Sequence, residues 1–191
     1  MYKILTVMLA GLLFTFAGCD ETATTANGNL ENTAIVNDAK PLTSKVEDKD
    51  DDKEFMTKVA QGGLMEVKLG ELAAKKAQNP EVKAFAEQMV KDHGQANEEL
   101  KSLANEKNFK LPTEITEDQQ ETYDELAKLS GKEFDEKYVE TMLEDHEEDV
   151  ELFEDQAEES EDAQVKSFAE KTGKIIKSHY EKIKEIEDKM D

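Results

Sequence analysis

The chain has three histidines, and all of them fall on the apolar faces of expected helices. His93 comes four residues after Met89 and His146 comes four after Met142, so each shares a helix face with an apolar side chain. His179 lies four residues from an isoleucine on either side. Because an inward face covers about a third of a helix, chance alone would produce this pattern roughly once in thirty. The three imidazoles are therefore predicted to point into a helical core.

Two carboxylates are predicted to share that core. Glu66 is the only charged residue near the centre of the apolar face of the first helix, and Asp149 follows His146 by three residues within the same arc. Counted from the turn at Asn79, Glu66 and His93 come at the same height. One Glu and three His on four facing helices suit zinc, iron or copper. The predicted metal ligands are Glu66, His93 and His146, with Asp149 or His179 completing the set.

The height of His179 sets it apart from the other candidates. His146 lies about 13 residues before the turn at Ser160, whereas His179 lies about 19 after it, which is a displacement of roughly 9 Å between regular helices. The sequence therefore predicts that His179 misses the site unless a bend near Gly173 or a different loop restores the register.

Two alternatives to this metal site follow from the same residues. Met89 and Met142 each place a thioether one turn from an imidazole, a combination that favours soft copper, but both methionines also suit the filling of a core. Buried imidazoles can equally be satisfied by carboxylates or hydroxyls, which gives a structural polar layer that fixes helix pairing. The side chains available for such a layer are Glu66, Asp149 and Tyr138.

The elements that must position these residues are all predicted to be helices. From residue 53 onward the apolar residues follow a helical period, and signals for strands are absent from this part of the sequence. Asn79 and Pro80 are typical of a helix start, and Thr116-x-x-Gln119 and Ser130-x-x-Glu133 are typical capping boxes. The expected helices cover residues 53–78, 79–107, 116–129 and 130–158, with a last helix after Ser160.

An internal repeat relates the two halves of this helical region. The segment NPEVKAFAEQMVKDHG at 79–94 is similar to DAQVKSFAEKTGKIIKSHY at 162–180, and FMTKVAQGG at 55–63 is more weakly similar to FDEKYVETM at 134–142. Two related helix pairs packed on each other form a four-helix bundle with pseudo-twofold symmetry. The sequence therefore predicts an all-α bundle with a short extra helix in the central connection.

The charge of the chain argues against a nucleic-acid partner. Asp and Glu number 46 against 24 Lys and Arg, which gives a formal net charge of -22. Nucleic-acid binding depends on basic side chains that meet phosphates, so a chain this acidic would repel DNA and RNA.

The N-terminus has the pattern of an export signal. Residues 1–18 contain Lys3 and an apolar run too short to span a bilayer, and Phe16-Ala17-Gly18-Cys19 resembles the lipobox of bacterial lipoproteins. The alternative is an ordinary secretory signal with an incidental cysteine. Residues 19–52 are polar and acidic, which predicts a disordered tether between a lipidated Cys19 and a bundle at 53–191. We therefore expect a bacterial envelope protein anchored to the membrane through Cys19.

Several longer motifs carry a resemblance to a known family. AQGGLMEVKLGELA, NPEVKAFAEQMVKDH, LPTE and FDEKYVETMLEDHEEDVELF resemble bacterial envelope proteins with a ferritin-like four-helix domain of unknown function, often labelled outer-membrane proteins. The resemblance covers about residues 53–190 and implies the fold but no activity. Di-iron members of the wider ferritin-like superfamily use Glu-x-x-His pairs, and the residues three before the histidines here are Val90, Leu143 and Ile176. An iron-storing or di-iron oxidase role is thereby disfavoured.

The sequence favours a non-catalytic envelope module that acts through protein contact or in a stress response, and the alternative is a metal-binding bundle. An enzyme is not supported, because the sequence offers no nucleophile with a paired base, no glycine-rich phosphate loop and, with Cys19 as its single cysteine, no redox dithiol. The protein partner and a homo-oligomeric state are left open.

Overall fold

The computed structural model describes residues 44–190, with side chains from residue 50 onward. The predicted signal segment, Cys19 and the tether up to residue 43 lie outside this range. All of the secondary structure within the described range is α-helical, as predicted, and none of these helices is both long and apolar enough to cross a membrane. The helices are α1 (Ser44–Lys76), α2 (Pro80–Glu106), α3 (Glu117–Lys128), α4 (Lys132–Glu159) and α5 (Ala163–Met190).

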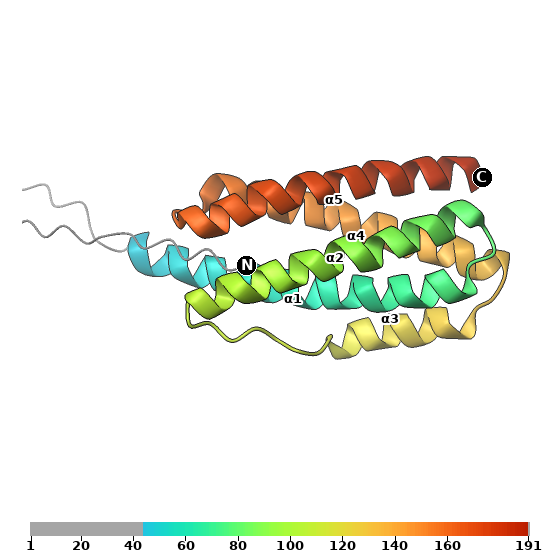
Figure 1. The fold of residues 1–191 in the computed structure, drawn as a ribbon, viewed down its shortest axis with the longest axis horizontal. Helices are drawn as coiled ribbons and strands as arrows, with labels where there is room; N and C mark the ends of the chain where they lie inside the picture. The colour runs from blue at the N-terminus through green and yellow to red at the C-terminus, as the bar shows by residue number, and fades with distance from the viewer. Residues whose placement is uncertain (1–43, 191) are drawn as a thin grey trace, which may run out of the picture. The chain divides into compact units, whose positions relative to one another are not determined.

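Four long helices form the bundle as two antiparallel hairpins. Hairpin α1–α2 packs on hairpin α4–α5, with α2 against α5 and α1 against α4. The turns of the two hairpins lie at opposite ends of the bundle, so each helix runs antiparallel to both of its neighbours (Figure 1). The short α3 and its connections carry the chain along α1 from one end of the bundle to the other (Figure 1). This arrangement agrees with the predicted pair of related hairpins and the extra helix between them.

Two of the predicted helix starts are confirmed by their capping hydrogen bonds. The Asn79 side chain accepts a hydrogen bond from the backbone N–H of Glu81 at 2.8 Å, and Pro80 is the first residue of α2. At α3, Thr116 Oγ1 accepts from the Gln119 backbone N–H, and the Gln119 side chain accepts from the Thr116 N–H. Both caps satisfy helical N–H groups that have no partner within the helix.

The capping box predicted at Ser130 is wrong. The cap of α4 is Gly131, which has φ 67° and provides no side-chain hydrogen bond. This left-handed conformation suits glycine, which has no Cβ. The acidic residue that matters in this turn is Asp135, because its carboxylate accepts from the backbone N–H groups of Gln78 at 3.1 Å and Asn79 at 2.7 Å. Asp135 thus ties the start of α4 to the α1–α2 turn.

The first helix begins earlier than the composition indicates. It starts at Ser44, so the segment 44–52 is helical rather than part of the predicted tether. Asp52 is only 7% exposed and accepts hydrogen bonds from Ser160 Oγ at 2.7 Å and Gln156 Nε2 at 2.5 Å. Contacts with the end of α4 therefore order a segment that carries too few apolar residues to be recognised as helix.

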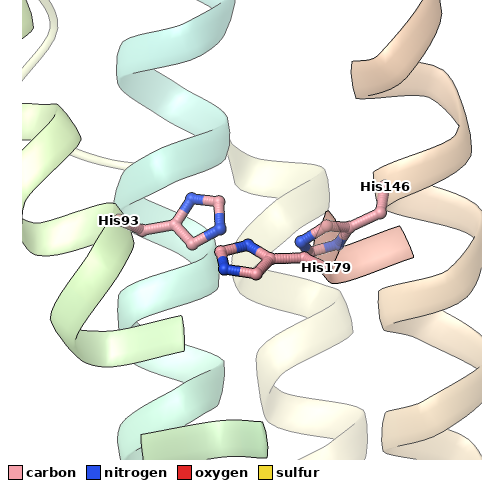
Figure 2. Close-up of side chains that lie close together, drawn as sticks. All are labelled: His93, His146 and His179. Carbon is pink, nitrogen blue, oxygen red and sulfur yellow. The ribbon is translucent and has the colours of Figure 1, made fainter. Parts of the chain in front are cut away.

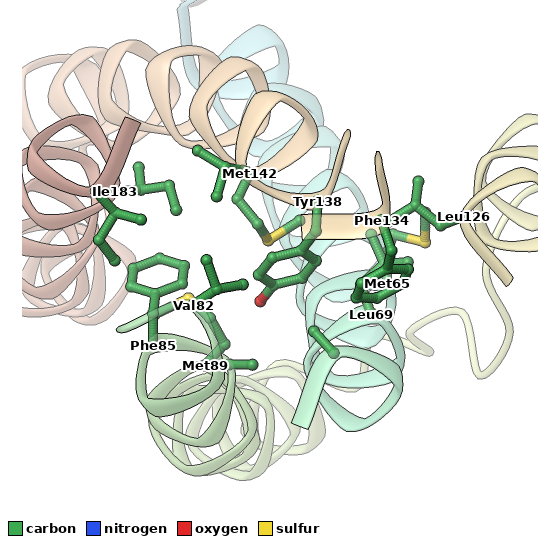
Figure 3. Packing of buried hydrophobic residues seen from close by; sticks show 14 residues of the cluster. Met65, Leu69, Val82, Phe85, Met89, Leu126, Phe134, Tyr138, Met142 and Ile183 are labelled. Atoms are coloured by element: carbon green, nitrogen blue, oxygen red, sulfur yellow. The ribbon is translucent and has the colours of Figure 1, made fainter. Parts of the chain in front are cut away.

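Two apolar clusters fill the bundle and leave a polar layer between them. The first surrounds Phe85, Phe134 and Tyr138 and includes Met89, Met142 and Leu126 of α3 (Figure 3). The second surrounds the rings of Phe55, Phe153 and Phe168. Along α2, α4 and α5, each histidine follows the residues of one cluster and precedes those of the other. The polar residues predicted to face inward therefore form a separate layer.

Candidate metal centre

The three histidines meet in the middle of the bundle, as their spacing on apolar faces predicts. His93 is residue 14 of the 27 in α2, and His146 is residue 15 of the 28 in α4. Figure 2 shows both rings together with the ring of His179 from α5. The ring centroids are 5.3 to 5.6 Å apart, and the exposed fractions of the residues are 3%, 0% and 1%. Three helices from both hairpins thus contribute one imidazole each.

The expected displacement of His179 is wrong because it was counted from the wrong residue. The cap of α5 is Asp162, whose carboxylate accepts from the backbone N–H groups of Gln164 at 3.0 Å and Val165 at 3.2 Å. Asp162 is also the partner of Asn79 in the internal repeat. His146 precedes Asp162 by 16 residues and His179 follows it by 17, so the two imidazoles lie level without any bend at Gly173.

Glu66 of α1 joins the layer as predicted. Its carboxylate is 1% exposed, and its Oε2 lies 2.5 Å from His93 Nδ1. The other oxygen, Oε1, is 3.5 Å from His146 Nε2, which is beyond an ordinary hydrogen bond. Glu66 therefore holds the His93 ring on one side and approaches the His146 ring on the other.

The remaining two imidazoles are also oriented by hydrogen bonds at their outer nitrogens. His146 Nδ1 donates to the backbone carbonyl of Met142 at 2.9 Å. His179 Nε2 donates to Asp92 Oδ2 at 3.1 Å. Because a carbonyl or carboxylate oxygen only accepts, these bonds place the hydrogen of each neutral ring on the outer nitrogen. The inner nitrogens of both rings then carry lone pairs.

The inner nitrogens of all three rings are buried and face a common space. Among the described residues, His93 Nε2, His146 Nε2 and His179 Nδ1 have no hydrogen-bond partner. One ligand atom from each of these histidines lies within 4.8 Å of the other two. The lone pairs of His146 Nε2 and His179 Nδ1 cannot satisfy each other, because no hydrogen lies between them. A cation at the centre of the three inner nitrogens would satisfy all of them at once.

Burial sets the protonation of this layer. It lowers the pKa of His146 to about 3 and that of His179 to about 4, and it also lowers the pKa of His93. The neighbouring His93 ring lowers the first two pKa values further. Burial also raises the pKa of Glu66 to about 8. The imidazoles are therefore neutral at physiological pH, which is the form that binds metal ions.

Further carboxylates of α4 lie beside the layer. Glu66, Asp145 and His146 form a second group whose ligand atoms lie within 4.8 Å of one another. Burial raises the pKa of Asp145 to about 8 and that of Asp149 well above its ordinary value, and Glu66 raises both pKa values further. The predicted candidate Asp149 is thus coupled electrostatically to Glu66, but Asp145 is the carboxylate that shares a ligand group with it.

Asp145 and Asp92 were not predicted from the sequence. Asp145 follows Met142 by three residues and precedes Asp149 by four, so the helical period could have identified it. Asp92 has no such signal, because its contact with His179 depends on how α2 and α5 pack. Met89 and Met142 are fully buried in the first apolar cluster, and their role as thioether ligands stays a prediction.

Comparison with known families identifies the domain. A model of the family described as a domain of unknown function (DUF4142) matches residues 37–186. The chain belongs to this family. The match covers Glu66 and all three histidines, so the candidate site lies within the DUF4142 domain. Among curated proteins, none matches this chain.

Solved structures share the fold of the DUF4142 domain at low sequence identity. A DUF305 fragment from Deinococcus radiodurans has a TM-score of 0.65 at 10% identity, covering 73% of this chain and 96% of that one. CopM in its Cu(I)-bound form has a TM-score of 0.62 at 16% identity, covering 72% and 96%. A secreted DUF305 protein from Streptomyces coelicolor has a TM-score of 0.62 at 14% identity, covering 73% and 93%. These similarities support the ferritin-like helical bundle.

Proposed function

We propose that the DUF4142 domain of this chain binds one transition-metal ion through His93 Nε2, His146 Nε2 and His179 Nδ1. The observation that carries this proposal is the convergence of three buried imidazole nitrogens without hydrogen-bond partners among the described residues. The outer nitrogen of each ring contacts a carboxylate or a carbonyl oxygen. Metal-binding histidines have this arrangement, since the outer contact fixes the tautomer and the ring orientation.

The buried carboxyls of the layer also favour a cation. Glu66 is almost fully buried, and among the described residues its Oε1 has no hydrogen-bond partner. Asp145 and Asp149 add two more carboxyls whose charged forms are disfavoured by burial. A divalent cation would stabilise the charged forms of these carboxyls, whereas a purely structural layer leaves several buried polar atoms unsatisfied at a cost of about 1–3 kcal/mol each. This difference favours the metal site over the structural layer.

Copper is the first metal to test. Imidazole nitrogens bind copper, zinc and iron, so the ligand types alone do not separate these metals. Structures of CopM in Cu(I)-bound, Cu(II)-bound and Ag-bound forms share this fold. The missing Glu-x-x-His pairs argue against a di-iron centre. We therefore assign the site to copper, with zinc and iron as the comparison metals.

The position of the domain in the cell is a second part of the proposal. We propose that the chain is exported and held at the envelope by a lipid on Cys19, since residues 16–19 resemble a lipobox. Labelling with a radioactive or clickable fatty acid tests this assignment. Label that enters the wild-type chain and is lost in Cys19→Ser supports it, and equal labelling of both chains contradicts it.

The experiment for the metal site measures metal content and thermal stability of the purified full-length protein. Copper at about 100 times its Kd should stabilise the native state by about 2.7 kcal/mol, because the unfolded chain lacks the assembled site. His146→Leu should abolish this stabilisation by copper. The control is Thr172→Val, which replaces a buried polar residue of α5 and should keep the stabilisation. Absence of metal and of any copper-dependent shift in the wild type would overturn the metal site and favour the structural layer.

A further inference from the structure

The site is buried among the helices, and Asp145 beside it also lines a surface pocket. This pocket has a volume of about 300 Å³ and lies between α1, α3 and α4. Its acidic lining residues are Glu125 of α3 and Glu144, Asp145 and Glu148 of α4. Lys137, the basic residue in the lining, has its ammonium group 2.8 Å from Glu140 Oε2. The acidic residues therefore outnumber the basic one at this opening.

Asp145 connects the pocket to the buried layer. It lines the pocket, and its ligand atom lies within 4.8 Å of those of Glu66 and His146. Its Oδ2 is buried and, among the described residues, has no hydrogen-bond partner. On the inner side, Glu66 is 1% exposed and its Oε1 is likewise unpartnered within the described part of the chain. Both residues that share a ligand group with His146 thus carry a carboxylate oxygen without a partner among the described residues, and one of the two lines the pocket.

We propose that this pocket is the access route for the metal ion, and that Asp145 and Glu66 bind the cation transiently before the histidines take it. The inference rests on the proposed metal site and adds the path by which the ion reaches it. His146 belongs to both ligand groups, and among its two ring nitrogens only Nε2 is free of a hydrogen bond. Two ions therefore cannot bind His146 at the same time, and an ion held first by Asp145 and Glu66 would reach the histidines by exchanging oxygen ligands for nitrogen ligands.

The acidic opening gives this route an electrostatic driving force. Negative side chains around a recessed opening concentrate cations and raise their association rates, and salt weakens this effect. The three glutamates at the opening are exposed enough to act on ions in solvent, whereas Asp145 acts at the inner end. Removing the three glutamate charges should therefore change how the association rate of the cation depends on salt. Removing the Asp145 carboxylate should change the rate at which the cation passes to the histidines.

The test follows Cu²⁺ uptake by the full-length protein in a stopped-flow instrument. The chain has no Trp and 4 Tyr, so quenching of tyrosine fluorescence reports binding. Asp145→Asn should slow both association and dissociation at least about tenfold while the equilibrium affinity changes little, because a transit ligand affects both directions equally. Thr141→Phe should act in the same direction, since it fills the pocket and keeps every carboxylate. Glu151→Gln, an exposed charge on α4 outside the pocket, should leave both rates unchanged.

A second series tests the outer charges. Glu144→Gln combined with Glu148→Gln should weaken the dependence of the association rate on ionic strength. Unchanged rates in both Asp145→Asn and Thr141→Phe would overturn the route. So would faster dissociation of Asp145→Asn with unchanged association, because Asp145 would then be a ligand of the bound ion. Failure of the wild type to bind Cu²⁺ at equilibrium would overturn the proposed function itself, so the two failures are distinct.

Discussion

Glu66 and His93 face each other across the α1–α2 hairpin, with Glu66 Oε2 2.5 Å from His93 Nδ1. Both side chains are buried, so this contact orients the ring more firmly than an exposed ion pair would. The contact leaves His93 Nε2 directed at the other two imidazoles. Glu66 of α1 is thus the partner that orients the proposed ligand atom of α2, His93 Nε2.

Replacing Glu66 by Gln should weaken copper binding by about 10- to 100-fold, the usual effect of removing a partner of a metal-binding histidine. Glutamine keeps the shape of the side chain but removes the negative charge near the ion. Competition titrations against a chelator of known affinity measure the change. Glu71→Gln, an exposed residue of the same helix, is the matched control. A loss of copper affinity no larger than that of Glu71→Gln would show that Glu66 does not support the site.

Two glycines of α1 should respond to alanine in opposite ways. A Cβ at Gly62 would have no atom within 4 Å, whereas a Cβ at Gly70 would lie 2.9 Å from Val90 Cγ2 and 3.0 Å from the Ala86 carbonyl oxygen. Gly62→Ala should stabilise the protein by about 0.5–1 kcal/mol through helix propensity. Gly70→Ala should destabilise it by about 1–3 kcal/mol, because α1 and α2 must move apart.

Urea denaturation of the metal-free protein measures both changes, and each variant is the control for the other. Equal effects of the two substitutions would contradict the close approach of α1 and α2 at Gly70. A stable Gly70→Ala variant would mean that Val90 and the α2 backbone move aside at little cost.

Asp135→Ala should destabilise the fold by about 1–3 kcal/mol. The substitution leaves the N–H groups of Gln78 and Asn79 without their acceptor in a partly buried turn. Asp135→Asn should cost less, because its remaining oxygen can still accept a hydrogen bond. Chemical denaturation is the measurement, and Glu133→Ala, an exposed residue of the same helical turn, is the control. If Asp135→Ala loses no more stability than Glu133→Ala, the hydrogen bonds of Asp135 do not stabilise the turn.

Asp52 should make stability depend on pH. Burial raises its pKa above 3.8, partly offset by the hydrogen bond from Ser160, so the folded protein holds this proton more tightly than the unfolded chain does. The resulting stabilisation is fully present below pH 3.8 and is lost as the pH rises through the pKa of the folded state. Asp52→Asn should therefore be more stable than the wild type at neutral pH, with the difference shrinking as the pH falls.

Thermal melts of both chains between acidic and neutral pH test the Asp52 prediction. The comparison variant is Asp51→Asn, an exposed neighbour on the same helix. If the wild type instead gains stability relative to Asp52→Asn as the pH rises, the pKa of Asp52 is lowered by folding, and the prediction is contradicted.

The sequence predicted those features that depend on local spacing. Helical periodicity identified the inward faces of His93, His146 and His179, and short-range capping patterns identified the starts of α2 and α3. These signals involve residues within one or two turns of each other, so the chain encodes them without reference to the packing of distant helices.

Features that depend on distant contacts escaped the sequence reasoning. The early part of α1 contacts Ser160 and Gln156 through Asp52, about a hundred residues away along the chain, and Asp135 caps a turn on the other hairpin. The height of His179 is a different case, because the cap of α5 at Asp162 is a local pattern that counting from Ser160 overlooked. Helix boundaries that depend on tertiary hydrogen bonds cannot be predicted from the local sequence.

The division of the ligands between the two hairpins has a mechanical consequence. Hairpin α1–α2 carries Glu66 and His93, and hairpin α4–α5 carries His146 and His179. Neither half holds all three imidazoles, so an ion at the centre would join them as a crosslink does, at a point midway between the ends. Such a link would resist separation of the halves while leaving their outer ends free to fray, and its release would loosen the middle of the bundle first.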